Sequence, residues 1–214
     1  MKLESMTQTG VKDACLLCVF DDASKLKIPP FLAVQFDLYP QKELSDDLYA
    51  ELRAAAERER VHQRAVRIIS ACAISEQGLY RRLLEKGERE EDAAEAVAWL
   101  KELRLLDDGK TAEQIVRSAA AKGYGRARAE HMLYEKRIPR ELWEEALAHL
   151  PQSDDAIDRF VHQRLDGRKL DEKLIKRTLD ALIRRGYSWQ EARSALSRYR
   201  DACEDETAYL EDIE

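Results

Sequence analysis

The chain has 214 residues, of which 36% are charged and 7% aromatic, and its formal net charge is −6. This composition favours a soluble, mainly helical protein over a β-sandwich. No apolar run approaches the roughly 20 residues that a membrane span needs, and the N-terminal residues lack the apolar core of a signal peptide. We therefore expect a cytoplasmic protein with no membrane partner.

Residues 1–44 are expected to form a small β-like segment. Within it, residues 1–10 are expected to be frayed, and 14–20 and 25–28 fit two strands joined by a turn. After a break at two consecutive prolines, residues 31–38 alternate partly between apolar and polar, which predicts a third strand. A segment of this size needs the helices that follow for a core.

Cys15 and Cys18 have the CxxC spacing of many zinc and redox sites. A zinc site would need two further ligands at suitable spacing, and no second CxxC or histidine pair supplies them. A redox pair would lie where a strand turns into a helix, whereas this pair lies inside an apolar run. We interpret both residues as buried strand cysteines, and we expect no disulfide framework in a reducing compartment.

From residue 45 onward the pattern is helical and repeats about every 50 residues. Residues 61–64 and 161–164 both read Val-His-Gln-Arg, and 111–114 lie halfway between them. Self-similarity at a fixed period is typical of stacked supersecondary units. We therefore predict a linking helix with repeat 1 over 45–107, repeat 2 over 108–151, repeat 3 over 152–202, and an acidic tail over 203–214.

Helix boundaries follow from capping residues. Gly87 and Gly186 are expected just beyond helix ends, where a left-handed backbone favours glycine. The charged residues 57–60 are expected to be solvated, in a helix that either runs from 45 to 71 or breaks there. The acidic run 88–95 is assigned to the start of the next helix, where the dipole favours it. The predicted N-caps are Ser45, Ser75, Asp107 or Asp108, and Ser188.

Catalytic and metal-binding motifs are missing from the sequence. No HExxH, GxGxxG after a strand, or GxSxG is present, so we expect neither an enzyme nor a cofactor. His62 and His162 occupy equivalent repeat positions, which indicates packing or a surface role. Trp143, Trp189 and Tyr199 are assigned to the core, and aromatic residues do not interleave with the basic ones as on a single-strand stacking platform.

Positive charge concentrates in repeats 2 and 3. Residues 109–140 carry eight Lys/Arg and three acids, 164–200 carry eleven and five, and 201–214 carry seven acids and no base. Such asymmetry suggests a polyanionic partner or an acidic protein surface, although charged helix faces are often merely solvated. The candidate partner-binding residues are Arg117, Lys122, Arg126, Arg128, Lys173, Lys176, Arg177, Arg184 and Arg185.

Three passages resemble the RecX family of bacterial regulatory proteins. The most specific contains Leu105–Asp108, Val116–Ser118, Gly123, Gly125 and Arg126, and the others lie at 75–87 and 184–196. Four residues depart from the family's usual pattern, which has an aromatic at position 111 and often at 88. They are Glu88, Thr111, Ala119 and Ala129.

The resemblance implies three tandem three-helix repeats in an elongated, curved module. It also implies binding to a filament of the recombinase RecA on single-stranded DNA, with inhibition of ATP hydrolysis and strand exchange. On this interpretation the protein is a monomer, and its basic faces also contact single- or double-stranded DNA. Two alternatives stay open: a helix-turn-helix-like module that binds DNA directly, and a helical-repeat scaffold for another protein.

Overall fold

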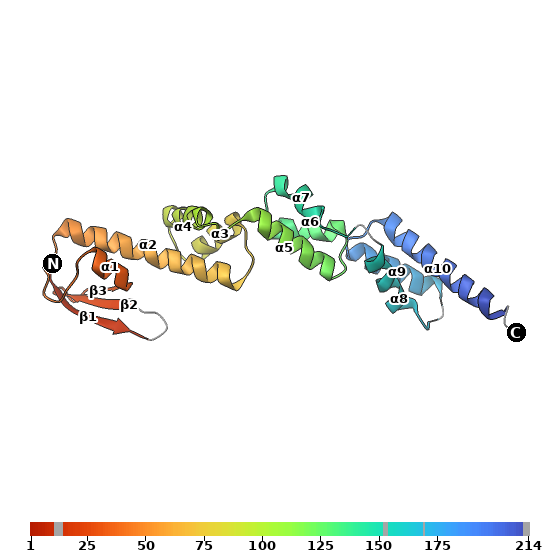
Figure 1. The fold of residues 1–214 in the computed structure, drawn as a ribbon, viewed down its shortest axis with the longest axis horizontal. Coiled ribbons are helices and arrows are strands. Elements are labelled where there is room, and N and C mark those ends of the chain that lie inside the picture. The colour runs from red at the N-terminus through yellow and green to blue at the C-terminus, as the bar shows by residue number, and fades with distance from the viewer. Residues whose placement is uncertain (11–14, 152–153, 169, 212–214) are drawn as a thin grey trace. The chain divides into compact units, whose positions relative to one another are not determined.

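The computed structural model describes residues 1–10, 15–151, 154–168 and 170–211 (Figure 1). The protein is mainly helical with one small antiparallel sheet at its N-terminus, which confirms the predicted fold class. The chain divides into two compact units, Met1–Cys72 with Leu79–Leu106, and Ala73–Gly78 with Asp107–Glu214. No described helix is long and apolar enough to cross a lipid bilayer.

The first unit begins with a three-stranded sheet of order β1-β2-β3. β2 (Cys15–Phe20) and β3 (Lys25–Ile28) form the predicted hairpin. β1 (Leu3–Thr9) corrects the expectation of frayed residues, because it pairs with β2 and places Leu3 in the core. Local sequence patterns do not report such non-local pairing.

Cys15 and Cys18 are both buried in β2, as predicted. Burial raises the pKa of the Cys18 thiol to about 11, so the thiol stays protonated near neutral pH. A protonated, buried thiol is a poor nucleophile and a poor metal ligand. The Cys18 side chain therefore belongs to the core that packs on the sheet, and Cys15 is buried at the other end of the same strand.

The third strand predicted over 31–38 is wrong. This segment forms the short helix α1 (Pro30–Gln35), with Pro30 at its first turn, where the ring presets a helical φ and no N–H is needed. Leu32 and Ala33 point into the core, whereas Phe31 and Val34 are exposed. The helix contacts both β2 and the long helix α2 (Asp46–Ala71) (Figure 1).

Helix α2 is unbroken over its 26 residues, and the side chain of Ser45 caps it by accepting a hydrogen bond from the Leu48 N–H. Its first half covers the sheet, and its second half packs on α4 (Glu90–Glu102). In the sequence, α3 (Glu76–Glu85) lies between α2 and α4, and its Leu79 and Leu83 are buried.

The second unit contains two groups of three helices, if the short η1 and the adjoining α7 are counted as one helical segment. The first group is α5 (Asp108–Ala121), α6 (Arg126–Glu135) and the short η1 (Arg140–Leu142) with α7 (Trp143–Leu147). The second is α8 (Asp155–Leu165), α9 (Glu172–Arg184) and α10 (Trp189–Glu211). Asp107 caps α5, and Ser188 caps α10 through reciprocal bonds with Glu191.

One helix ending recurs at the end of α3, α6 and α9. Each is followed by a residue in the left-handed region, namely Gly87 (φ 84°), Arg137 (φ 58°) and Gly186 (φ 89°). The N–H of the residue that follows donates to the carbonyl five residues earlier. These hydrogen bonds run from Glu88 to Leu83 at 3.1 Å, from Ile138 to Leu133 at 3.1 Å and from Tyr187 to Leu182 at 3.2 Å. This is the Schellman motif, whose second residue is usually apolar and packs inward.

Glu88 therefore occupies an apolar position, since Ile138 fills its counterpart after α6. Its carboxylate is 1% exposed and pairs with the guanidinium groups of Arg60 and Arg64 on α2. Arg60 also binds Glu57, 3.0 Å from Nε to Oε2. Two predictions are corrected here: Arg60 is not merely solvated, and Glu88 lies before α4 in a buried ion pair. The acids Glu90, Glu91 and Asp92 do lie in the first turn of α4, as predicted for the acidic run.

His62 and His162 pack on aromatic side chains 37 residues further along, Trp99 and Tyr199. The His62 imidazole stacks on Trp99 at 4.1 Å between ring centroids with 2° between planes, and His162 meets Tyr199 edge-on at 5.0 Å. His62 is buried and serves packing, whereas His162 is exposed on α8 and also contacts Asp166 at 3.2 Å, so the two equivalent positions divide between the predicted packing and surface roles.

We predict that the first unit loses stability as the pH falls below about 6.5, the ordinary histidine pKa. Burial lowers the pKa of His62, although Glu95 and Glu59 oppose the shift. Below pH 6.5 His62 binds a proton in the unfolded chain but remains largely unprotonated in the folded chain. Lowering the pH in this range therefore favours unfolding. Denaturant midpoints at pH 7.5 and 5.5 should differ less in His62→Phe than in wild type, whereas His162→Phe, which removes an exposed histidine, should retain the wild-type difference.

Candidate partner-binding site

Two tight bends in the second unit carry much of the predicted basic surface. The first joins α5 to α6 through Gly123, at φ 65°, and Gly125. The second joins α9 to α10 through Gly186. The left-handed backbone at Gly123 and Gly186 ends each preceding helix and turns the chain sharply.

The two bends meet backbone to backbone. The Gly125 N–H donates to the Arg185 carbonyl at 2.9 Å, and the Ala127 N–H donates to the Gly186 carbonyl at 3.1 Å. A Cβ on Gly125 would lie 2.4 Å from the Gly186 oxygen, and one on Gly186 would lie 2.2 Å from the Arg128 nitrogen. Only glycine allows this approach at both positions.

Arg185 braces the same joint with its side chain. Its Nη1 donates to the Lys122 carbonyl at 3.0 Å, and its guanidinium lies 4.3 Å from the Phe160 ring centroid and 5.8 Å from that of Tyr124. The Tyr187 hydroxyl donates to the Gly123 carbonyl at 3.2 Å. The Arg185 guanidinium therefore stabilises the contact between the two bends, and because it is engaged there it is poorly placed to bind a partner.

Five predicted site residues gather at the joint, and we call them the two-bend surface: Lys122, Arg126, Arg128, Arg184 and Arg185. Arg126 is paired with Glu130 at 2.9 Å and with Glu144 at 2.7 Å. Lys122, Arg128 and Arg184 form no ion pair with any residue that the structure describes. Those three cations are the ones available to a partner.

The other four predicted residues lie elsewhere. Lys173, Lys176 and Arg177 are exposed in the first two turns of α9, roughly 10 Å or more along the helix from Arg184 at 1.5 Å per residue. Arg117 lies on α5 and is paired with Glu113 at 3.1 Å. The sequence thus grouped together residues that the fold separates.

Aromatic side chains do accompany the basic ones, which corrects two predictions. Trp189 is 58% exposed instead of belonging to the core, and Arg193 lies over its ring at 5.2 Å. Arg128 lies 5.9 Å from the Tyr124 ring centroid. Trp189 and Arg193 both lie on α10, where a spacing of four residues places side chains on one helix face, so the spacing of that pair was a usable signal. Tyr199 is buried as predicted, and Trp143 is half-buried.

Among the described residues, no group of three or more His, Cys, Asp or Glu is arranged to hold a metal ion. The second unit presents cationic and aromatic side chains around two bends that are joined by backbone hydrogen bonds. Successive three-helix groups of this kind define a class of helical-repeat proteins.

The family model of the RecX second three-helix domain matches residues 107–147. Regulatory protein RecX of Vibrio campbellii is 30% identical over 135 residues, which cover 62% of this chain and 87% of that protein. Its counterpart in Shigella dysenteriae is 37% identical over 98 residues, covering 41% and 59% respectively. The chain belongs to the RecX family.

Solved structures agree on the fold. A crystal structure of a regulatory protein RecX aligns with a TM-score of 0.63 over 92% of this chain and 98% of that one, at 17% identity. The structure of RecX from Lactobacillus salivarius aligns with a TM-score of 0.56 over 67% and 97%, also at 17% identity. At this identity the likeness supports the fold and not individual contacts.

Proposed function

We propose that this protein is a non-enzymatic regulator that binds the RecA filament on single-stranded DNA and inhibits its ATPase and strand-exchange activities. Membership of the RecX family supports the class of function. The observation that carries the assignment of a binding face is the two-bend surface. There, Lys122, Arg128 and Arg184 have no ionic partner among the described residues and lie on a joint fixed by backbone contacts.

The chemistry of this surface suits an anionic partner. Guanidinium groups bind carboxylates and phosphates through charge-assisted, often bidentate hydrogen bonds. The whole chain carries a net charge of −6, so attraction must come from local charge, which acts within a Debye length of about 8 Å at physiological salt. Because the joint is already ordered, little conformational entropy is lost when it binds.

The direct test is the ATPase rate of the cognate RecA on single-stranded DNA with this protein titrated in. Inhibition well below one molecule per RecA monomer is the expected result, since a filament can be blocked at few positions. If neither inhibition nor binding to that filament occurs, the proposed function is wrong, although membership of the family is unaffected.

We predict that the double reversal Arg128→Glu with Arg184→Glu weakens filament binding at least tenfold, because each of the two lost charge-assisted contacts contributes about 1.5–3 kcal/mol. Helicity measured by circular dichroism should not change, since neither side chain holds the joint. A double reversal of Arg53 and Arg67, exposed on α2, changes the net charge equally and should bind as wild type. Wild-type affinity of the first variant would exclude the two-bend surface.

Direct DNA binding is a second candidate, and the contacts Arg128–Tyr124 and Arg193–Trp189 favour it. Aromatic rings with neighbouring arginines bind single strands by base stacking and phosphate contact. This candidate predicts a steep loss of affinity with rising salt in the absence of any partner protein. Binding only in the presence of RecA would argue against it.

A further inference from the structure

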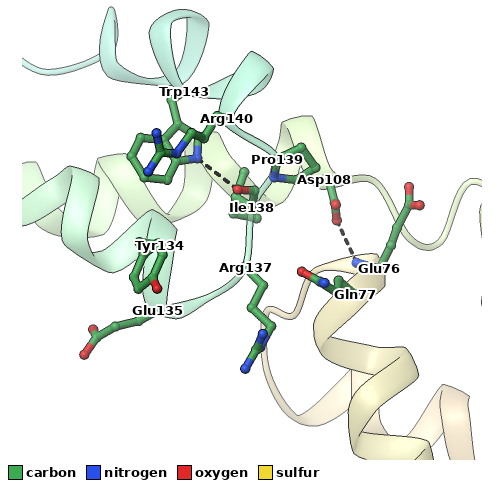
Figure 2. Close-up of a pocket in the computed structure, with 10 residues that line it drawn as sticks. All are labelled: Glu76, Gln77, Asp108, Tyr134, Glu135, Arg137, Ile138, Pro139, Arg140 and Trp143. Carbon is green, nitrogen blue, oxygen red and sulfur yellow. Dashed lines mark hydrogen bonds between the residues drawn. The ribbon is translucent and has the colours of Figure 1, made fainter.

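A cavity of about 670 Å³ lies in the second unit (Figure 2), and no residue of the two-bend surface lines it. Its walls come from the first turn of α3, the start of α5, the end of α6 and the segment that leads into α7. The Glu76 N–H donates to the Asp108 carboxylate at 2.8 Å, and both residues belong to the second unit. This volume lies within the range of pockets that bind small molecules, about 300–1,000 Å³.

Aromatic and cationic side chains alternate along one wall at intervals of three residues: Tyr134, Arg137, Arg140 and Trp143. Tyr134 is 64% exposed. Arg140 lies 5.7 Å from the Trp143 ring centroid, and the Trp143 indole donates to the Ile138 carbonyl at 3.0 Å. The indole is thereby held in place, whereas the Tyr134 ring is left open for stacking.

Arg137 is the least expected of these residues. It occupies the left-handed position, φ 58°, that Gly87 and Gly186 occupy after the equivalent helices. A side chain other than glycine is disfavoured there. Its guanidinium forms no ion pair with the described part of the chain, and Figure 2 shows it between Tyr134 and Gln77. The left-handed backbone alone would indicate nothing, but Arg137 is also a cation without an ionic partner among the described residues, and it lines the same cavity as the exposed Tyr134 ring.

We propose that this cavity binds a nucleotide, with the base stacked on Tyr134 and a phosphate bound by Arg137. A flat, exposed ring and an available guanidinium that line the same cavity fit a base joined to a phosphate, since base stacking on aromatic side chains tolerates every base and guanidinium groups bind phosphate bidentately. The Gln77 amide oxygen can accept hydrogen bonds from base amines or sugar hydroxyls. The nucleotide is either free or part of a single strand, and the two sources share this chemistry.

The test uses the full-length chain with Trp99→Phe and Trp189→Phe, which leaves Trp143 as the sole tryptophan. Adenosine monophosphate, an eight-residue oligothymidylate and inorganic phosphate are titrated separately while Trp143 fluorescence is followed. Saturable quenching by the monophosphate assigns the site to free nucleotides, and quenching by the oligonucleotide alone assigns it to a single strand. An absence of saturable quenching by both, or equal quenching by phosphate alone, would overturn the proposal.

The decisive variant is Arg137→Gly, because it separates binding from folding. Glycine is favoured at φ 58°, so the melting temperature should be unchanged or slightly higher, whereas affinity should fall at least tenfold. Arg104→Gly is the matched control, since Arg104 has φ 55° after α4 and does not line this cavity. It should have a similar effect on stability and bind as the parent does.

Tyr134 provides a second, independent check. Tyr134→Phe should retain binding, because the ring remains, and Tyr134→Ala should weaken it roughly tenfold. Arg128→Glu with Arg184→Glu should leave the Trp143 signal intact, which separates this site from the proposed filament-binding surface. Parental affinity in Arg137→Gly or Tyr134→Ala would overturn the proposal.

Discussion

Replacing Arg60 and Arg64 together by alanine will lower the free energy of unfolding of the first unit by about 3–5 kcal/mol, the usual effect of leaving a buried charge without its partners. Glu88 is fixed in an inward-facing position by the helix ending after α3, and its carboxylate is 1% exposed. Without the two guanidinium groups this buried carboxylate loses both of its cationic partners. Denaturant unfolding followed through Trp99 fluorescence, with Trp143→Phe and Trp189→Phe in both the parent and the variant, would measure the loss.

The matched variant is Glu88→Ile, which restores the residue type that Ile138 has after α6. The side chains of Arg60 and Arg64 are 42% and 31% exposed, so both can turn to solvent. We therefore expect the free energy of unfolding to change by less than about 1 kcal/mol, because a well-packed apolar residue often replaces a buried ion pair without loss of stability. Equal losses in the two experiments would contradict this account of Glu88.

Gly125→Ala should lower the stability of the second unit by about 3 kcal/mol, near the upper end for a single substitution. Gly125 has φ −80°, which alanine adopts freely, so backbone strain does not contribute. The added Cβ would lie 2.4 Å from the Gly186 oxygen, and the two bends must therefore separate. We also expect weaker inhibition of the RecA ATPase, since the proposed surface spans both bends.

Gly167→Ala is the control for the general effect of replacing a glycine. Gly167 has φ 70°, and a Cβ added there would meet no atom within 4 Å. Its substitution should cost about 1 kcal/mol from the left-handed backbone alone and should leave inhibition unchanged. If Gly167→Ala proves as damaging as Gly125→Ala, close packing at the joint is not what stabilises it.

The helical part of the fold followed closely from the sequence, because its signals are local. Ser45, Asp107 and Ser188 cap helices where polar side chains precede apolar periodicity, and Gly87 and Gly186 end them. The N-terminal residues carried no comparable signal. A strand there depends on pairing with β2, and the apolar run 31–38 became a helix because Pro30 favours a first helical turn.

The candidate site was only partly predictable. The basic residues could be found by their charge, but the meeting of the two bends depends on a contact between Gly125 and Gly186, 61 positions apart. Arg185 was included as a cation, although its neighbours make it a brace. Glu88 shows the same limitation, since its partners lie more than 20 residues earlier in the chain.

The joint between the bends is made mainly by main-chain atoms, with Arg185 as the added side-chain brace. Most side chains around it can therefore be exchanged without altering the geometry on which they are displayed. Lys122, Arg128 and Arg184 could become neutral or acidic over evolutionary time while the glycines stay fixed. Related proteins can therefore carry different charges at this joint and bind different partners while the backbone geometry stays the same. For the same reason, binding could be changed by engineering these side chains.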